Sequence, residues 1–301
     1  AGIAAQIMQT PHLLLDNQEE AFRMLSRGDV SICPIQTLGQ VPLQPLLAGP
    51  DAQVCVKTGY AKDDNVFCVK IAAGGGTFAG NTGMMQVYCQ KTLRLQTLLQ
   101  DEGILTEMRT AAAACLASRI LMPQHVDAIG LIGASVQARW QLRFLRAIVP
   151  ASTRKVVVRS RSQASAAAFR HSMRESPCLL DRQWDIVTYQ EELESGNRKP
   201  FQQCALIHTV SCSRSPVLSA HDLLGDDGKR VSPLHISAMG ADSVGKQELS
   251  LDIVASADLL LCDSIAQSKQ CGELQHYFQS LGGETPSNTV LELGQFLNEA
   301  R

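Results

Sequence analysis

The strongest constraint in this sequence is the alternation of helical and strand-like segments that begins near residue 105 and continues to residue 262. Short apolar runs rich in Val, Ile and Leu recur there, and amphipathic or alanine-rich stretches separate them. Such alternation predicts a parallel, doubly wound sheet with helices on both faces. The expected strands are residues 128–132, 155–159, 185–188, 205–210, 235–239 and 259–262, and the expected helices are residues 106–121, 137–148 and 163–173.

The first third of the chain has a different pattern. Helical periodicity over residues 17–27 is followed by closely spaced strand-like segments with no helices between them, which favours an antiparallel or mixed sheet. The expected strands are residues 53–57, 65–71, 83–88 and 93–99. We therefore expect an α/β protein of two domains. A smaller α+β domain comprises residues 1–111 with the tail 286–301, and a Rossmann-type domain comprises residues 112–285.

Composition excludes several classes of protein. Hydrophobic residues make up 45% of the chain, so it can bury a large core and is not disordered. The formal charge of −2 supplies no basic surface for nucleic acid. No apolar run approaches the roughly 18 residues of a membrane helix, and the first residues lack a secretion signal. The ten cysteines and seven histidines avoid metal-ligand spacings, so we expect a cytoplasmic protein with reduced thiols and no metal.

A glycine-containing turn follows the first strand of the alternating region. Gly133-Ala-Ser-Val-Gln-Ala138 resembles the dinucleotide fingerprint G-x-G-x-x-G/A, with Ser135 at the second glycine. Gly133 permits the tight turn, Ala138 permits close packing on the strand, and the helix N-terminus presents free N–H groups to a pyrophosphate. Ser135 departs from the pattern because its side chain crowds the phosphates. A plain strand–turn–helix junction is the alternative.

The end of the next expected strand bears on the cofactor. The fingerprint's usual partner for a free ribose 2′-hydroxyl is an acidic residue. This chain has Arg159-Ser160-Arg161-Ser162 there, two cations and two hydroxyls that suit a 2′-phosphate. We therefore expect NADPH to be preferred over NADH. The alternative is a basic turn that only faces solvent.

Three charged residues stand out because of where they lie along the chain. Asp242 follows the strand 235–239, where ligands of doubly wound sheets gather, although it could simply cap a turn. Lys70 lies inside an apolar strand, so its ammonium either reaches solvent at an edge or faces a cleft. Arg109 begins a helix, where a cation gains nothing from the helix dipole, which suggests an anionic ligand or a surface salt bridge.

Four segments together resemble the ornithine cyclodeaminase/mu-crystallin family. They are Val69–Ile71, Leu105–Ala114, Gly130–Ala138 and Ala238–Leu249, in that family's order and spacing, and the later Cys271–Leu274 resembles its Gly-Glu segment. The resemblance implies a homodimer whose first domain binds substrate and pairs sheets across the dimer. It implies that the Rossmann domain holds NAD or NADP. It also implies hydride transfer at an amino or imino carbon next to a carboxylate.

The resemblance also implies roles for individual residues. Lys70 matches the lysine that binds the substrate carboxylate and relays protons, Arg109 the carboxylate-binding arginine, and Asp242 the catalytic aspartate. The expected substrate-binding residues are Gln44, Lys57, Lys70 and Arg109. The expected cofactor-binding residues are Thr110, Gly133, Ala134, Ser135, Val136, Gln137, Arg159, Ser160, Arg161, Thr209, Val210, Ser211, Met239 and Gly240.

Two departures from the family pattern bear on the substrate. Gln44 replaces the arginine that usually binds the substrate carboxylate, so we expect Lys57, Lys70 and Arg109 to bind it instead. Lys57 lies near the place where true ornithine cyclodeaminases need an acid for the distal amine. These features favour an NAD(P)H-dependent reductase of an imino acid, of the ketimine or pyrroline-2-carboxylate type. The alternatives are an ornithine cyclodeaminase-type enzyme and a non-catalytic NADPH-binding protein like mu-crystallin.

Overall fold

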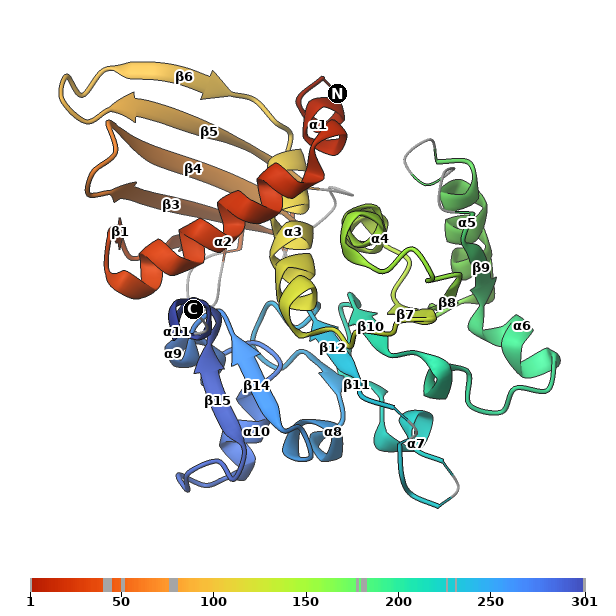
Figure 1. Ribbon diagram of the computed structural model, residues 1–301. Coiled ribbons are helices and arrows are strands. Elements are labelled where there is room, and N and C mark those ends of the chain that lie inside the picture. Colours follow the sequence, from red (N-terminus) through yellow and green to blue (C-terminus); the bar gives the residue numbers. More distant parts are fainter. Residues whose placement is uncertain are drawn as a thin grey trace.

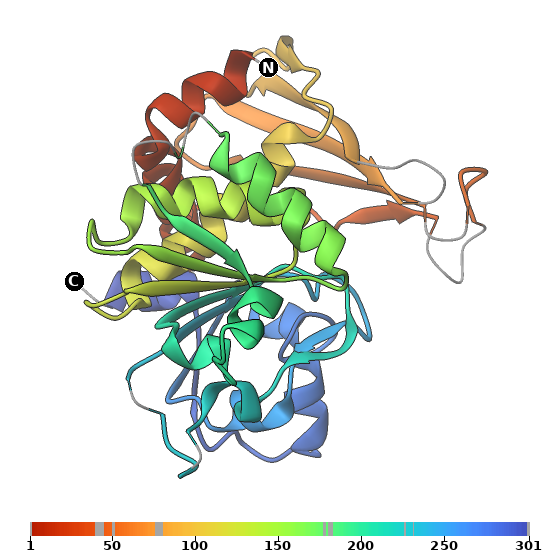
Figure 2. The same cartoon turned by 90° about the vertical axis from the view of Figure 1, so that its right-hand side faces the viewer.

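Two main sheets and the helices between them form the molecule, shown in Figure 1 and, from the side, in Figure 2. The computed structural model describes residues 2–39, 45–49, 52–75, 81–176, 179, 183–225, 227–230 and 232–299. Within these residues no helix combines the length and the apolar character that crossing a membrane requires.

The first sheet has six strands, and every pairing in it is antiparallel, which confirms the expected antiparallel or mixed sheet. Its order is β1-β3-β4-β5-β6, and β2 pairs with β3. The bounds are β1 (Val30–Ile32), β2 (Gln36–Leu38), β3 (Gln53–Ala61), β4 (Val66–Gly74), β5 (Asn81–Cys89) and β6 (Leu95–Leu99). β3 extends four residues beyond its expected end because residues 58–61 pair with β1 or β4.

Three helices lie beside this sheet: α1 (Gly2–Gln9), α2 (Pro11–Arg27) and α3 (Ile104–Leu121). The helix expected over residues 17–27 begins six residues earlier, at Pro11, whose fixed backbone suits a first helical turn. It ends at Arg27, and the following Gly28 adopts a φ of +72° and donates its N–H to the last turn. α3 lies between the two main sheets in Figures 1 and 2.

The second sheet has five strands, all parallel, in the order β12-β10-β7-β8-β9. Their bounds are β7 (Ala128–Ile132), β8 (Lys155–Arg159), β9 (Asp185–Thr188), β10 (Leu206–Thr209) and β12 (His235–Ala238). Numbered along the chain, this is the order 3-2-1-4-5 of a Rossmann-type sheet, so the expected fold class is confirmed. Helices α4 (Val136–Ile148) and α5 (Gln163–Arg174) follow β7 and β8.

One expected strand of this sheet lies elsewhere. β14 (Leu259–Cys262) pairs in parallel with β15 (Thr289–Glu292), in a separate two-stranded sheet. The apolar run 259–262 predicts a strand but does not specify its neighbour, so the expectation that β14 continues the main sheet was wrong. The remaining elements are α6 (Tyr189–Glu194), η1 (Pro200–Gln203), β11 (Arg214–Leu218), α7 (Ala220–Leu223), β13 (Gln247–Leu249), α8 (Leu251–Ala255), α9 (Ile265–Ser268), α10 (Gln275–Ser280) and α11 (Leu293–Glu299).

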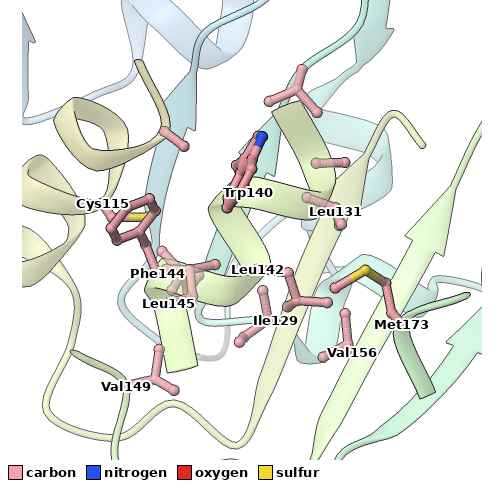
Figure 3. Packing of buried hydrophobic residues seen from close by; sticks show 14 of the residues in the cluster. Cys115, Ile129, Leu131, Trp140, Leu142, Phe144, Leu145, Val149, Val156 and Met173 are labelled. Atoms are coloured by element: carbon pink, nitrogen blue, oxygen red, sulfur yellow. The ribbon is translucent and has the colours of Figure 1, made fainter. Parts of the chain in front are cut away.

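Buried apolar residues cover both faces of the parallel sheet. Ile129 and Leu131 of β7 pack with Phe144 of α4 in the cluster of Figure 3. Ala128 and Ile132 of the same strand belong to a second cluster, which also contains residues of η1, α7 and α8. Alternate residues of a strand point to opposite faces, so β7 must be apolar throughout, and all five of its residues are buried.

The last helix of the chain, α11, packs against α2. The carbonyl of Leu297 in α11 accepts a hydrogen bond from Arg23, and the Asn298 side chain donates to the Arg23 carbonyl at 3.2 Å. A Cβ at Gly294 would lie 2.3 Å from the Phe22 carbonyl oxygen, so glycine permits the close approach of α11 to α2. The expected domain limit between residues 111 and 112 falls inside α3, and the domain limits stay a prediction.

Candidate active site

Four strand ends of the parallel sheet meet at one edge, where their loops are tied together by backbone hydrogen bonds. Gly133, after β7, donates to the Arg159 carbonyl at the end of β8 at 2.8 Å, and Val210, after β10, donates to the Ile132 carbonyl at 2.8 Å. Met239, after β12, donates in turn to the Thr209 carbonyl at 2.9 Å. The expected cofactor residues therefore converge at the carboxyl edge of the sheet, where doubly wound proteins bind nucleotides.

Gly133 makes a close backbone approach at this edge. Its φ is +116°, and a Cβ there would lie 2.8 Å from Cγ2 and 2.9 Å from the carbonyl oxygen of Val210. The next helix, α4, begins after Ser135, whose side chain makes no capping hydrogen bond to the described residues and is exposed beside Val136. The first N–H groups of α4 can therefore bind an anion, so the local geometry fits a dinucleotide pyrophosphate.

A contact between α3 and α4 brings this nucleotide edge close to the first domain. Gln137, in the first turn of α4, donates from its side chain to the Glu107 carbonyl of α3 at 3.1 Å. Trp140 donates its indole N–H to the Glu107 carboxylate at 3.2 Å. Arg109 and Thr110 follow Glu107 by two and three residues on α3. Residues two apart on a helix do not share a face, so Arg109 points to a different side of α3 from Glu107.

Lys57, Lys70 and Arg109 form a group that we call the cationic cluster. Lys57 of β3 and Lys70 of β4 are paired across the sheet, so their side chains leave the same face. Burial, followed by repulsion from Arg109 and Lys57, lowers the pKa of Lys70 to about 8, while Asp101 opposes the shift. Three neighbouring cations of this kind suit the binding of an anion.

Arg109 is exposed to solvent, yet the protein around it desolvates the guanidinium and lowers its pKa. The opposing influence on the pKa of Arg109 comes from the carboxylate of Asp263, which directly follows β14. Sequence reasoning did not single out Asp263, although an acid placed directly after an apolar strand is a recognisable signal.

Asp242 is paired within its own loop in this structure. Its side chain is 73% exposed and forms an ion pair with Lys246, which lies in the same loop between β12 and β13. The carboxylate that acts on Arg109 is Asp263 instead. Gln44, the remaining expected substrate residue, lies outside the described residues. The described residues hold no group of three or more His, Cys, Asp or Glu side chains arranged to bind a metal.

The two arginines expected to bind cofactor differ in their surroundings. Arg159 is held by Asp222 at 3.1 Å, and its guanidinium stacks over the rings of Tyr189 and Phe201 at 5.0 and 4.8 Å. The pKa of Asp222 is lowered by hydrogen bonds from Ser219 and by Arg159, against the effect of burial. Arg161 is exposed in the turn after β8, and Ser160 is half-buried beside it. Arg161 is therefore the more accessible of the two cations.

Glu248 is a buried acid that sequence reasoning did not assign. Its carboxylate accepts hydrogen bonds from the Thr209 hydroxyl at 2.8 Å, the Ser211 N–H at 2.5 Å and the Gly240 N–H at 2.7 Å. A Cβ at Gly240 would lie 1.8 Å from the Ser211 carbonyl oxygen and 2.6 Å from the Glu248 carboxyl group, so only glycine fits. The carboxylate of Glu273 in turn accepts from the backbone N–H groups of Glu248 and Leu249.

Comparison with families of known proteins agrees with this geometry. Residues 93–298 match the model of a family described as the ornithine cyclodeaminase/mu-crystallin family. A protein of Rhizobium meliloti named as a dehydrogenase is 31% identical over 93% of this chain and 78% of its own length. The iminosuccinate reductase of Paracoccus denitrificans is 31% identical over 64% of this chain and 52% of its own length.

Solved structures share the fold. An archaeal alanine dehydrogenase dimer with bound NAD matches with a TM-score of 0.74 at 20% identity, over 96% of this chain and 80% of that one. The pyrroline-2-carboxylate reductase of Thermococcus litoralis, in complex with NADH and L-proline, matches with a TM-score of 0.75 at 18% identity, over 96% and 82%.

Proposed function

Because the chain belongs to the ornithine cyclodeaminase/mu-crystallin family, we propose that it is a nicotinamide-dependent reductase of a small imino acid. The observation that carries the proposal is the position of the cationic cluster. Arg109 lies on α3 two residues from Glu107, which contacts the first turn of α4, and the charge of Arg109 lowers the pKa of Lys70 on β4. An anionic substrate bound between them would lie close to the nucleotide edge.

The substrate carboxylate binds to the cationic cluster. Arg109 can grip a carboxylate with two parallel N–H donors, and Lys70 adds a single charged donor. With a pKa of about 8, Lys70 is mostly protonated at neutral pH and lies close to the range where it can also transfer a proton. When bound, the reduced nicotinamide supplies the hydride that reaches the imine carbon next to this carboxylate.

Asp242 is the proposed group that orients the imine nitrogen or relays its proton. Its loop follows Met239 and Gly240 at the end of β12, so the loop starts at the nucleotide edge. In this role its ion pair with Lys246 opens when substrate binds. Asp242→Asn keeps the shape and removes the charge, so it should lower turnover by on the order of 10²-fold while nucleotide affinity stays unchanged. An Asp242→Asn enzyme with wild-type turnover would remove Asp242 from the mechanism.

We propose NADP(H) as the preferred cofactor, with Ser160 and Arg161 at the 2′-phosphate. Arg159 contributes less than the sequence suggests, because Asp222 and two aromatic rings already hold it. A charged hydrogen bond to phosphate contributes about 1.5–3 kcal/mol, so Arg161→Ala should weaken NADPH binding by tenfold or more and leave NADH binding unchanged. Fluorescence titration of both cofactors measures this. Equal losses for NADPH and NADH would contradict it.

A cyclodeaminase is the second candidate function, and the family description favours it. Such an enzyme oxidises an amine, releases ammonia on ring closure and then reduces the imine with the same cofactor. Lys57, which is paired with Lys70, disfavours a cyclodeaminase. Its cation lies near the place where the distal amine of ornithine needs an acid. Net consumption of reduced cofactor separates the two: a reductase consumes it, and a cyclodeaminase regenerates its oxidised cofactor.

Assembly and location complete the proposal. One face of the first sheet carries Val54, Val56, Phe67, Val69 and Ile71, all half-buried, and this face suits a second copy of the chain. We therefore propose a homodimer that pairs through this sheet. The nine described cysteines are all free thiols, which is compatible with the cytoplasm as the proposed location.

A further inference from the structure

Three of the expected cofactor residues share one partner that the proposed mechanism does not use. Thr209 ends β10, Ser211 lies just beyond it, and Gly240 follows β12. All three donate to the carboxylate of Glu248, whose side chain comes from a different strand, β13. Glu248 is fully buried. A buried acid with three donors on its two oxygens is a stable connection between the ends of β10 and β12.

The same geometry limits what Glu248 can do chemically. Its oxygens are occupied by Thr209, Ser211 and Gly240, so the carboxylate is not presented to a ligand. Its effect on a ligand must pass through the two strand ends that it joins. The exclusion of a side chain at Gly240 by Ser211 and Glu248 shows how closely these parts are packed.

Glu273 forms a second layer behind Glu248. Its carboxylate accepts from the N–H of Glu248 at 3.0 and 3.1 Å and from the N–H of Leu249 at 2.6 Å, so it holds the backbone of β13. Burial raises the pKa of both acids, and the pKa of Glu273 rises to about 7. Burying two acids this close together is costly, which indicates that their hydrogen bonds serve a purpose beyond filling space.

The sheet order indicates which part of a dinucleotide these strand ends meet. β10 and β12 lie on one side of β7, and β8 and β9 lie on the other. In a doubly wound sheet the two halves of a dinucleotide lie on opposite sides of the first strand, with the pyrophosphate at its end. The adenosine half would therefore lie over β8, near Arg161, and the nicotinamide half over β10 and β12.

We propose that Glu248 is a positioning residue that holds the ends of β10 and β12 in the shape that binds the nicotinamide half of the cofactor, and that Glu273 supports it by holding β13. This inference rests on the proposed function only in requiring a nicotinamide cofactor. It does not depend on which imino acid is reduced.

Separate binding of the two halves of the cofactor tests the proposal. Isothermal titration measures the affinities of wild type and Glu248→Gln for NADPH and for 2′-phospho-ADP-ribose, which lacks the nicotinamide ring. Gln keeps one acceptor oxygen but turns an NH₂ group toward N–H donors. We expect NADPH affinity to fall by on the order of tenfold and the affinity for 2′-phospho-ADP-ribose to stay within about twofold of wild type.

Glu192→Gln is the matched control. Glu192 is also buried and accepts hydrogen bonds from Asn197 and Gln203, but its partner Lys155 begins β8, away from the carboxyl edge. This control should leave both affinities unchanged even if it lowers the melting temperature. If Glu248→Gln does not fold, Glu273→Gln is tested in its place. It should also lose affinity for NADPH but not for 2′-phospho-ADP-ribose, and the loss should be smaller.

The outcomes separate this inference from the proposed function. A wild-type protein that binds no NADPH and no NADH would overturn the proposed function. A wild-type protein that binds NADPH, with a Glu248→Gln variant that loses both ligands equally or neither, would overturn the positioning role alone.

Discussion

At the scale of single residues, the surroundings of Lys70 lower the pKa of its ammonium group. Its pKa of about 8 lies below the ordinary value of 10.5, because of burial and the nearby Arg109 and Lys57. The ammonium is therefore present below pH 8 and is lost above it. We expect the KM for an imino-acid substrate to rise as the pH increases through about 8.

The control for this prediction is Lys70→Arg, since a guanidinium keeps its charge throughout this range. Its KM should be independent of pH between about 7 and 9.5, even if the absolute value is higher. A wild-type KM that does not change across about pH 8 would show that the charge on Lys70 does not bind the substrate.

Glu273 predicts a pH dependence of stability. Its folded-state pKa of about 7 is raised above the ordinary value of 4.5 by burial and by Glu248. Between these values the folded state binds more protons than the unfolded state, so stability falls as pH rises from about 5 to 7.5. Glu273→Gln removes this titration. As pH rises over this range, the melting temperature of wild type should fall relative to that of Glu273→Gln. A difference that stays constant with pH would show that Glu273 does not have this raised pKa.

Individual residues were predictable where local sequence specifies the geometry. Gly133 follows from a strand, a tight turn and a helix in succession, and Lys70 from a charge inside an apolar strand. Glu248 and Asp263 were not assigned, because their roles depend on contacts with distant segments, such as Thr209 and Arg109. The neutralisation of Arg159 was missed for the same reason, since Asp222 lies 63 residues further on.

At the level of elements, the turn between β7 and α4 is tightly constrained. Gly133→Ala forces an L-residue into a φ of +116° and its Cβ against Val210. Gly196→Ala is a matched control, because Gly196 has a φ of +94° but nothing within 4 Å of the place where a Cβ would lie. The control should cost about 1 kcal/mol of stability.

Gly133→Ala should cost about 2 kcal/mol or more, since overlap adds to the backbone strain. It should also weaken cofactor binding, because the turn moves away from the pyrophosphate position. Denaturant unfolding and cofactor titration measure the two effects. If the two variants lose the same stability and bind cofactor equally well, the turn is not the nucleotide-binding element.

Most helices and strands could be predicted from the sequence, but the pairing of the strands could not always be predicted. The strands β7, β8 and β9 have the expected bounds because apolar runs bounded by turns specify a buried parallel strand. β14 was also recognised as a strand, but its pairing with β15 depends on the return of the chain near residue 289. Sequence periodicity contains no information on such a partner.

At the level of the whole molecule, the apolar face of the first sheet predicts the assembly. Phe67 and Tyr88 stack on this face with centroids 4.8 Å apart, and both are half-buried in a single chain. Phe67→Asp places a charge there and should convert a dimer into a folded monomer in sedimentation experiments. Leu193→Asp, at a 38% exposed position on α6 in the other sheet's domain, should leave the dimer intact. A monomeric wild-type protein at micromolar concentration would contradict the proposed dimer.

The central claim is that the cationic cluster and the nucleotide edge act together on an imino acid. The most direct test incubates the wild-type protein with NADPH or NADH and, separately, pyrroline-2-carboxylate, piperideine-2-carboxylate, and pyruvate with amines. A parallel reaction supplies NAD+ or NADP+ with ornithine. We predict oxidation of reduced cofactor in equal amount to the amino acid formed from one of the imines, without release of ammonia. Release of ammonia from ornithine with no net change in cofactor, or no turnover of any member of the panel, would contradict the reductase.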